Sequence, residues 1–197
     1  DKKGNFKHLA LSLPDTWRIT PDSHFEKKVD IIIGIGRNSP VMDGFLKRYI
    51  AEHPDMTYAS PVMEDGKRVF YSNKGEYLGL SKTREDYKNI IRKARCFIYT
   101  TPGIDGGEVR SKGYNQVTPR FLEHISAGCN PVLRYKANPD TDFYELEKFC
   151  QSINTYEEFA AVMDRARSIP ADMAAVSEYL EKHYTSTRVK ELNELLK

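Results

Sequence analysis

Cysteine is scarce in this sequence, and the few that occur lie far apart. The 197 residues include three cysteines, Cys96, Cys129 and Cys150, and no Cys-x-x-Cys pair. This spacing gives no disulfide framework and no paired ligands for a structural zinc site. Because Cys96 and Cys129 adjoin apolar, strand-like runs, we expect buried, reduced thiols.

Long apolar runs are also missing. The sequence has no stretch of about 18 apolar residues and no secretory signal, so we expect no integral membrane segment. The first residue is Asp1 instead of methionine, and we expect the chain to be part of a longer polypeptide.

An excess of charge of one sign is absent as well. Lys and Arg number 30 against 28 Asp and Glu, which gives a formal net charge of +2. This balance argues against a nucleic acid or an anionic membrane surface as the partner. Hydrophobic residues make up 40% of the chain, a value typical of a globular protein with one core of its own.

Short β-branched runs alternate with helical patterns along the first two thirds of the chain. Strands are expected over 29–35, 56–60, 76–80, 96–101 and 130–134, with a hairpin turn at 64–67. Helices are expected over 40–52, after Ser81 as N-cap, and over 115–127 with Gly128 at its end. The apolar runs scarcely alternate with polar residues, which is typical of strands buried on both faces of a parallel sheet.

The last third is expected to be helical. Asn154 is a candidate N-cap for a helix over 156–167, Pro170 suits the first turn of the next helix, and Thr185 is a candidate cap for an amphipathic last helix. We therefore predict an α/β fold, a Rossmann-like doubly wound parallel sheet with a helical C-terminus. Residues 1–28 are expected to be a linker, and 29–197 the domain.

Ligands of such folds bind beyond the carboxyl ends of the strands, so the residues that follow each strand are the candidate site. Gly34-Ile35-Gly36-Arg37 follows the first strand, where glycines let the backbone approach a phosphate and Arg37 can pair with its oxygens. A dinucleotide fingerprint fits poorly, because Ser39 occupies the third glycine position. A tight turn without a ligand is the alternative.

The loop over 103–115 is rich in glycine and charge and leads into the helix expected at 115. Backbone N–H groups over Gly113–Gln116 would point at an anion, and Arg110 and Lys112 could add charge. A surface loop without a ligand is the alternative. In the helix that follows, Glu123 could accept two hydrogen bonds from a ribose diol, or could be an ordinary exposed glutamate. His124 is expected on the helix surface.

Residues 121–132, Phe-Leu-Glu-His-Ile-Ser-Ala-Gly-Cys-Asn-Pro-Val, resemble the (F/L)-E-A-(M/I)-A-x-G-x-P-V segment of retaining glycosyltransferases of the GT-B type. Arg120 matches the R-x-F-E start found in a bacterial branch. Gly34–Arg37 is similar to the family's G-R turn, and Tyr77–Ser81 is similar to its (F/Y)-L-G-x-(V/L) strand. Tyr184–Arg188 is similar to the aromatic-containing segment that precedes the family's last helix. The ordered set covers roughly residues 29–197.

The resemblance implies that this domain binds a nucleoside diphosphate-sugar donor, with no metal and no further cofactor. Glu123 would bind the ribose, Arg37 and the Gly113–Gln116 turn the diphosphate, and the stretch around Leu80 would border the base. The residues implied to bind the nucleotide-sugar are Gly36, Arg37, Leu80, Ser81, Gly113, Tyr114, Asn115, Gln116, Arg120 and Glu123. Many relatives carry a Glu-x7-Glu motif, and this chain has Asn115 at the first Glu position.

The resemblance also implies a missing partner, an N-terminal acceptor domain of the same polypeptide. The chain is then the C-terminal half of a retaining hexosyltransferase for polysaccharide or glycoconjugate synthesis, inactive alone. We expect it to be cytoplasmic, peripheral to the inner membrane only through that other half. The alternatives are a degenerate, non-catalytic module of the same fold that serves protein contacts, and half of a sugar-nucleotide epimerase. A general dinucleotide-binding domain is a third.

Overall fold

A six-stranded sheet forms the centre of the molecule. The computed structural model describes residues 10–36, 39–106 and 111–196. The strands are β1 (Val29–Ile32), β2 (Tyr58–Glu64), β3 (Lys67–Ser72), β4 (Tyr77–Leu80), β5 (Ala94–Thr100) and β6 (Asn130–Arg134), in the order β4-β3-β2-β1-β5-β6. β2, β1, β5 and β6 are parallel, and β3 and β4 add antiparallel pairs at one edge. The predicted α/β class with a doubly wound sheet is confirmed.

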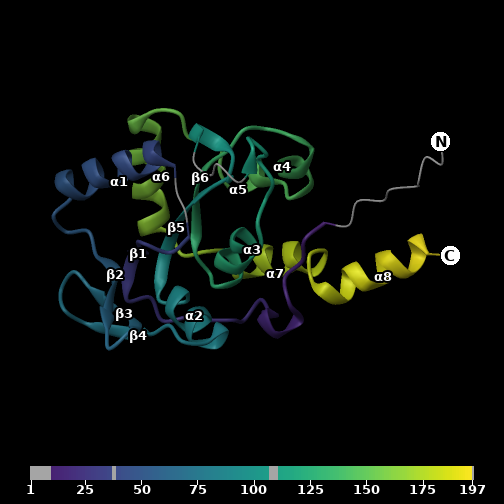
Figure 1. The fold of residues 1–197 in the computed structure, drawn as a ribbon, viewed down its shortest axis with the longest axis horizontal. Coiled ribbons are helices and arrows are strands. Elements are labelled where there is room, and N and C mark those ends of the chain that lie inside the picture. The colour runs from purple at the N-terminus through teal and green to yellow at the C-terminus, as the bar shows by residue number, and fades with distance from the viewer. Residues whose placement is uncertain (1–9, 37–38, 107–110, 197) are drawn as a thin grey trace.

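Helices cover both faces of the sheet. The helices of the described residues are α1 (Pro40–Glu52), α2 (Arg84–Ile91), α3 (Pro119–Ser126), α4 (Pro139–Phe143), α5 (Leu146–Phe149), α6 (Tyr156–Ser168), α7 (Met173–Glu181) and α8 (Thr185–Leu195). Two 3-10 turns with both ends in the described residues are Asp15–Trp17 and Ile104–Gly106. α1 and α6 lie on one face of the sheet, and α2, α3 and α7 on the other (Figure 1).

Local sequence explains several of these elements. Ser39 caps α1 by accepting a hydrogen bond from the backbone N of Met42 at 3.1 Å, and Pro40 provides the first residue of the helix. The predicted hairpin joins β2 and β3, with positive φ angles of 48° at Asp65 and 72° at Gly66. β5 is buried at nearly every position, as expected for a central parallel strand.

Several predicted helix starts are wrong by a few residues. α2 begins after Thr83 instead of Ser81, because Thr83 and Asp86 form a reciprocal capping box. α3 begins at Pro119 instead of 115, so the Gly113–Gln116 turn is not its N-terminus. The N-caps of α6 and α8 are Thr155 and Tyr184, each one position from the predicted cap. α7 begins at Met173 with Asp172 as its N-cap, so Pro170 lies before the first turn instead of in it.

Residues 10–28, expected as a linker, lie against the domain and contribute to its core. Leu13, Trp17 and Ile19 are almost fully buried. Leu13 forms a parallel bridge with Tyr184, and Arg18 pairs with Glu181 at 2.5 Å. The segment therefore ties α7 and the start of α8 to the rest of the molecule.

The last helix, α8, packs less than its pattern predicts. It begins beside Leu13, whose backbone O accepts from the backbone N of Thr185, and then projects from the body of the molecule (Figure 1). The apolar side chains of Val189, Leu192, Leu195 and Leu196 are exposed, and Arg188 is the buried residue of the helix.

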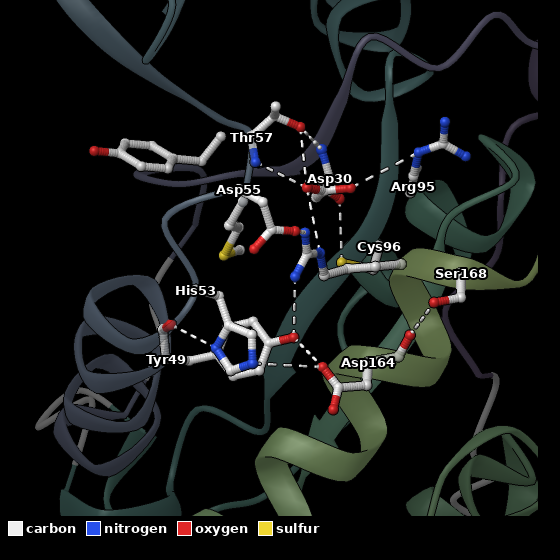
Figure 2. Close-up of polar contacts among 12 residues, drawn as sticks. Asp30, Tyr49, His53, Asp55, Thr57, Arg95, Cys96, Asp164 and Ser168 are labelled. Carbon is white, nitrogen blue, oxygen red and sulfur yellow. Dashed lines mark hydrogen bonds and ion pairs between the residues drawn. The ribbon is translucent and has the colours of Figure 1, made fainter.

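A polar network near the amino end of β1 joins both strands and helices (Figure 2). Asp30 of β1 accepts hydrogen bonds from the backbone N and the hydroxyl of Thr57, at 2.8 and 3.0 Å, and pairs with Arg167 of α6 at 3.3 Å. Arg167 also contacts Asp55 at 2.7 Å and the Tyr49 hydroxyl at 3.2 Å. These hydrogen bonds and ion pairs hold α1 and α6 to the sheet.

Candidate functional site

The strand order reverses between β1 and β5, and four of the predicted site residues line a cavity there. The chain leaves β1 towards β2 and later returns to β5 on the other side of β1. Ligands of open α/β sheets bind at the carboxyl edge beside such a reversal. A cavity of about 390 Å³ lies at this edge. The residues that line it are Ile35, Gly36, Arg68, Phe70, Ser81, Arg84, Tyr87, Thr118, Pro119, Arg120 and Glu123, and we call it the Glu123 pocket.

Glu123 is the buried acid of this pocket. It lies in α3 and is only 3% exposed, so the alternative of an ordinary exposed glutamate is wrong. Its carboxylate pairs with Arg84 of α2 and accepts a hydrogen bond from the Tyr87 hydroxyl. Burial raises the pKa of Glu123, while the charge of Arg84 acts in the opposite direction.

Arg120 lies one turn before Glu123 on α3 and forms the inner wall. Its guanidinium donates to the backbone O of Ile98 in β5 and lies 5.8 Å from the centre of the Tyr99 ring. Burial lowers the pKa of Arg120 from its ordinary value. An arginine side chain nevertheless stays charged in proteins. The pocket therefore holds a fixed positive charge beside the carboxylate of Glu123.

Gly36 closes the pocket from the side of β1. Its φ is +71°, and a Cβ atom at this position would overlap the guanidinium of Arg120. Gly34 has a φ of +70°, and its backbone O accepts a hydrogen bond from Arg68. Both positions therefore require glycine for steric reasons. Arg37, predicted to contact the diphosphate, lies outside the described residues.

Ser81 and Leu80 lie where β4 ends. Ser81 lines the Glu123 pocket, and its backbone N donates to the backbone O of Arg68 at 2.8 Å. Leu80 is half-buried in β4 directly before Ser81 and does not line the pocket.

The other predicted residues line a different cavity. Gly113, Tyr114, Asn115 and Gln116 face a space of about 640 Å³ at the same edge of the sheet, next to the end of β6. The remaining residues that line it are Leu11, Val117, Lys136, Ala137, Asn138, Pro139, Asp140 and Phe143, and we call it the Tyr114 pocket. The two pockets adjoin in the chain, because Val117 lines one and Thr118 the other.

His124, expected on the helix surface, is buried. Its ring stacks on Phe97 with centroids 4.7 Å apart, and its Nδ1 lies 2.9 Å from the backbone O of Arg120. Burial, and then the charge of Arg120, lower the pKa of His124 to about 3. The ring is neutral at physiological pH and packs as part of the core.

Two arginines and a tyrosine of the Glu123 pocket were missed in the sequence. Arg68 comes from the β2–β3 hairpin, and Arg84 and Tyr87 from α2. The sequence did contain one signal for the two residues of α2. The first turn of α2 follows the end of a strand, and residues that follow strand ends are candidate site residues. Together with Arg120, these arginines place three cations around one buried carboxylate.

Neither a metal site nor a membrane span is found in the described residues. Across residues 10–36, 39–106 and 111–196, no group of three or more His, Cys, Asp or Glu side chains could hold a metal ion. In the same ranges, no helix is long and apolar enough to cross a membrane. Cys96, Cys129 and Cys150 are free and buried, as predicted.

Comparison of the chain with models of known protein families, with curated proteins and with solved structures gives no match.

Proposed function

We propose that this chain binds a nucleoside diphosphate-sugar in the Glu123 pocket and serves as the donor-binding half of a glycosyltransferase. The observation that carries the proposal is the buried carboxylate of Glu123 in a pocket otherwise rich in arginine. A ribose diol needs a fixed acceptor, and a diphosphate needs fixed cations beside it. The Glu123 pocket offers both within one cavity.

The Arg84–Glu123 pair can open to admit the ligand. The Arg84 side chain is 61% exposed, whereas that of Glu123 is 4% exposed, so Arg84 is the partner that can move. A ribose diol on Glu123 would replace the hydrogen bonds that Arg84 donates, and the released guanidinium could turn to the diphosphate. Arg120 is held by β5 and would stay in place.

Sugar transfer also needs an acceptor site and a route for the leaving group. A positively charged pocket can stabilise the departing diphosphate electrostatically. The acceptor would come from an N-terminal domain, and we expect this chain alone to bind the donor without transferring sugar.

Thermal unfolding with a ligand panel tests the proposal. A ligand that binds the native state raises the melting temperature by mass action. UDP, GDP, ADP, CMP, their sugars and NAD would each be added to the wild type and to Glu123→Gln. Glu157→Gln, on the exposed face of α6, is the matched control.

We expect one diphosphate and its sugar to stabilise the wild type and Glu157→Gln, and to lose most of that effect with Glu123→Gln. Stabilisation by NAD alone, or an equal nucleotide effect in Glu123→Gln, would contradict the proposal. Glu123→Gln keeps the size of the side chain, so it separates loss of the acceptor from loss of packing.

One observation favours a second candidate, a degenerate module of the same fold that binds without catalysis. Asn115 occupies the position that corresponds to the first Glu of the Glu-x7-Glu motif in the glycosyltransferases that the sequence resembles. Its Oδ1 accepts from the Thr101 hydroxyl at 2.8 Å, and its Nδ2 donates to the Gly113 backbone O at 3.0 Å. The side chain therefore braces its own loop. Restoring the acid with Asn115→Glu in the complete polypeptide should leave turnover absent if the module is degenerate.

A further inference from the structure

The Tyr114 pocket has the features of a binding site that the nucleotide proposal does not use. Its volume of about 640 Å³ falls within the range of roughly 300–1,000 Å³ typical of small-molecule sites. Two aromatic rings in its wall are open to solvent, with Tyr114 75% exposed and Phe143 45% exposed. Exposed aromatic side chains in a concave wall mark a surface that a ligand covers.

Hydrogen bonds join the two loops that form the floor of this pocket. Asn138 donates to the backbone O of Asn115 at 3.1 Å and of Lys136 at 2.9 Å, so it joins the loop before α3 to the loop after β6. The Asp140 carboxylate accepts a hydrogen bond from the backbone N of Val117 across the same gap. A site that is ordered before binding loses little entropy when a ligand arrives.

Buried side chains pack against the Phe143 ring. The guanidinium of Arg188, a residue only 4% exposed, lies 5.0 Å from the centre of the Phe143 ring. Tyr144 and His183 contact the ring at centroid distances of 5.0 and 5.7 Å, close to perpendicular. The exposed part of the ring is therefore presented to the pocket in one orientation.

The rim carries polar groups that the protein itself leaves unused. The Lys136 ammonium, the Gln116 amide and the Tyr114 hydroxyl make no hydrogen bond or ion pair with the described residues. They can donate to, and in part accept from, the hydroxyl groups of a ligand.

We propose that the Tyr114 pocket binds a carbohydrate ring. A sugar ring has an apolar face of C–H groups, which stacks on an aromatic side chain, and a rim of hydroxyl groups, which needs alternating donors and acceptors. The pocket supplies two open aromatic rings and the polar rim of Lys136, Gln116 and Tyr114. An alkyl chain would need a continuous apolar wall, and these polar side chains interrupt it.

Binding of the sugar by itself would not require the nucleotide, so the inference can be tested apart from the proposed function. The sugar has two possible sources, the donor and a free acceptor glycan. Both present the same ring chemistry, and the experiment separates them.

The test measures binding by saturation-transfer NMR and titration. The probes are methyl glycosides of glucose, mannose and N-acetylglucosamine, glucuronate, and the disaccharides maltose and cellobiose. The variants are Tyr114→Ala and Phe143→Ala. Tyr77→Ala on β4 is the matched control, because Tyr77 is an exposed tyrosine that lines neither pocket. Because Tyr114 is exposed, its substitution leaves the core intact.

We expect at least one sugar to bind the wild type, with a tenfold or greater loss of affinity in Tyr114→Ala and none in Tyr77→Ala. The effect of nucleoside diphosphate on the melting temperature should be unchanged in Tyr114→Ala. If a disaccharide binds without nucleotide, the source is a glycan. If only a nucleotide-sugar gains affinity over its diphosphate, and Tyr114→Ala removes that gain, the source is the donor.

Two results would overturn the inference. One is the absence of binding for every sugar, free or nucleotide-linked, at millimolar concentration. The other is sugar binding that survives in both Tyr114→Ala and Phe143→Ala. Glu123→Gln should lose nucleotide binding and still bind free sugars. Failure of the nucleotide proposal is therefore distinguishable from failure of the sugar proposal.

Discussion

Gly36 shows at the scale of one residue how the Glu123 pocket depends on the backbone. Its positive φ and its contact with Arg120 both exclude a side chain. Arg120 in turn is fixed on Ile98 of β5. Any side chain at Gly36 therefore moves either the turn after β1 or the cation that lines the pocket.

Gly36→Ala should lower the free energy of unfolding by about 1–2 kcal/mol through the left-handed backbone conformation alone, and should weaken nucleotide binding by displacing Arg120. Gly44→Ala is the control, since Gly44 lies inside α1 with open space around it. That change should stabilise the protein by about 0.5–1 kcal/mol. Urea denaturation measures the change in the free energy of unfolding for both variants. Equal effects of the two substitutions would contradict the steric account.

The sequence singles out Glu123 because its neighbours in the chain carry a pattern. Its partners Arg84 and Tyr87 have no such pattern. Arg84 lies 39 positions away, and only the packing of α2 beside α3 brings the two charges together. An ion pair between two elements has no periodicity that a sequence could show.

At the scale of elements, one lysine joins the ends of two helices. Lys27 donates to the backbone O of Arg92, the C-cap of α2, at 3.1 Å, and to that of Ala127, the C-cap of α3, at 2.8 Å. Helix C-termini carry unpaired carbonyl groups and partial negative charge, so a cation suits both. Burial lowers the pKa of Lys27, and these carbonyl groups keep the buried ammonium satisfied.

Lys27→Met should lower the free energy of unfolding by about 1–3 kcal/mol, because two buried carbonyl groups lose their donor. Lys28→Met, one position along, removes an exposed ion pair with Glu26 and should change stability little. Chemical denaturation of the two variants side by side gives the comparison. If both changes had a similar, small effect on the free energy of unfolding, the two carbonyl groups would be hydrogen-bonded to water in Lys27→Met.

Element type is predictable in this chain to a greater degree than element boundaries. The strand over 130–134 and the helix over 40–52 have the predicted bounds. The start of α2 does not, because Ser81 and Thr83 are both acceptable caps, and only the reciprocal bond with Asp86 decides between them. Similarly, α3 begins only at Pro119, because the fixed φ of proline suits the first position of a helix.

Two buried histidines give the whole molecule a dependence on pH. The pKa of His124 is lowered to about 3, first by burial and then by the charge of Arg120. Burial and the charge of Arg188 lower that of His183 to about 3 as well. Both stay neutral in the folded protein at pH values where an unfolded histidine, with a pKa near 6.5, takes up a proton.

Stability should therefore fall as pH falls from about 6.5 towards 3, because the unfolded chain binds more protons over that interval. Each histidine contributes a slope of up to about 1.4 kcal/mol per pH unit. Denaturation between pH 7 and 5 isolates this effect from the titration of carboxyl groups at lower pH. His183→Gln should reduce the slope by up to half. A flat profile in the wild type between pH 6.5 and 5 would contradict the prediction.

At this scale, the sequence predicts the fold class and the edge of the sheet where a ligand would bind. It does not predict that the expected site residues divide between two cavities. That division follows from the position of residues 136–143 beside Gly113–Val117. Asn138 donates to the backbone O of Asn115 and Asp140 accepts from the backbone N of Val117, and these two bonds fix that position across more than twenty positions of chain. Nor do the polar residues among 10–28 reveal that Leu13 and Trp17 belong to the core.

The bridge between the N-terminal segment and α8 has a consequence for biosynthesis. Leu13 accepts a hydrogen bond from Thr185, which lies 172 positions later in the chain. At about 5–20 residues per second, a ribosome needs roughly ten to thirty seconds to make that stretch. Throughout this interval Leu13, Trp17 and Ile19 have no complete binding surface, and they remain open to chaperones. Folding of this domain can finish only after translation has passed its last helix.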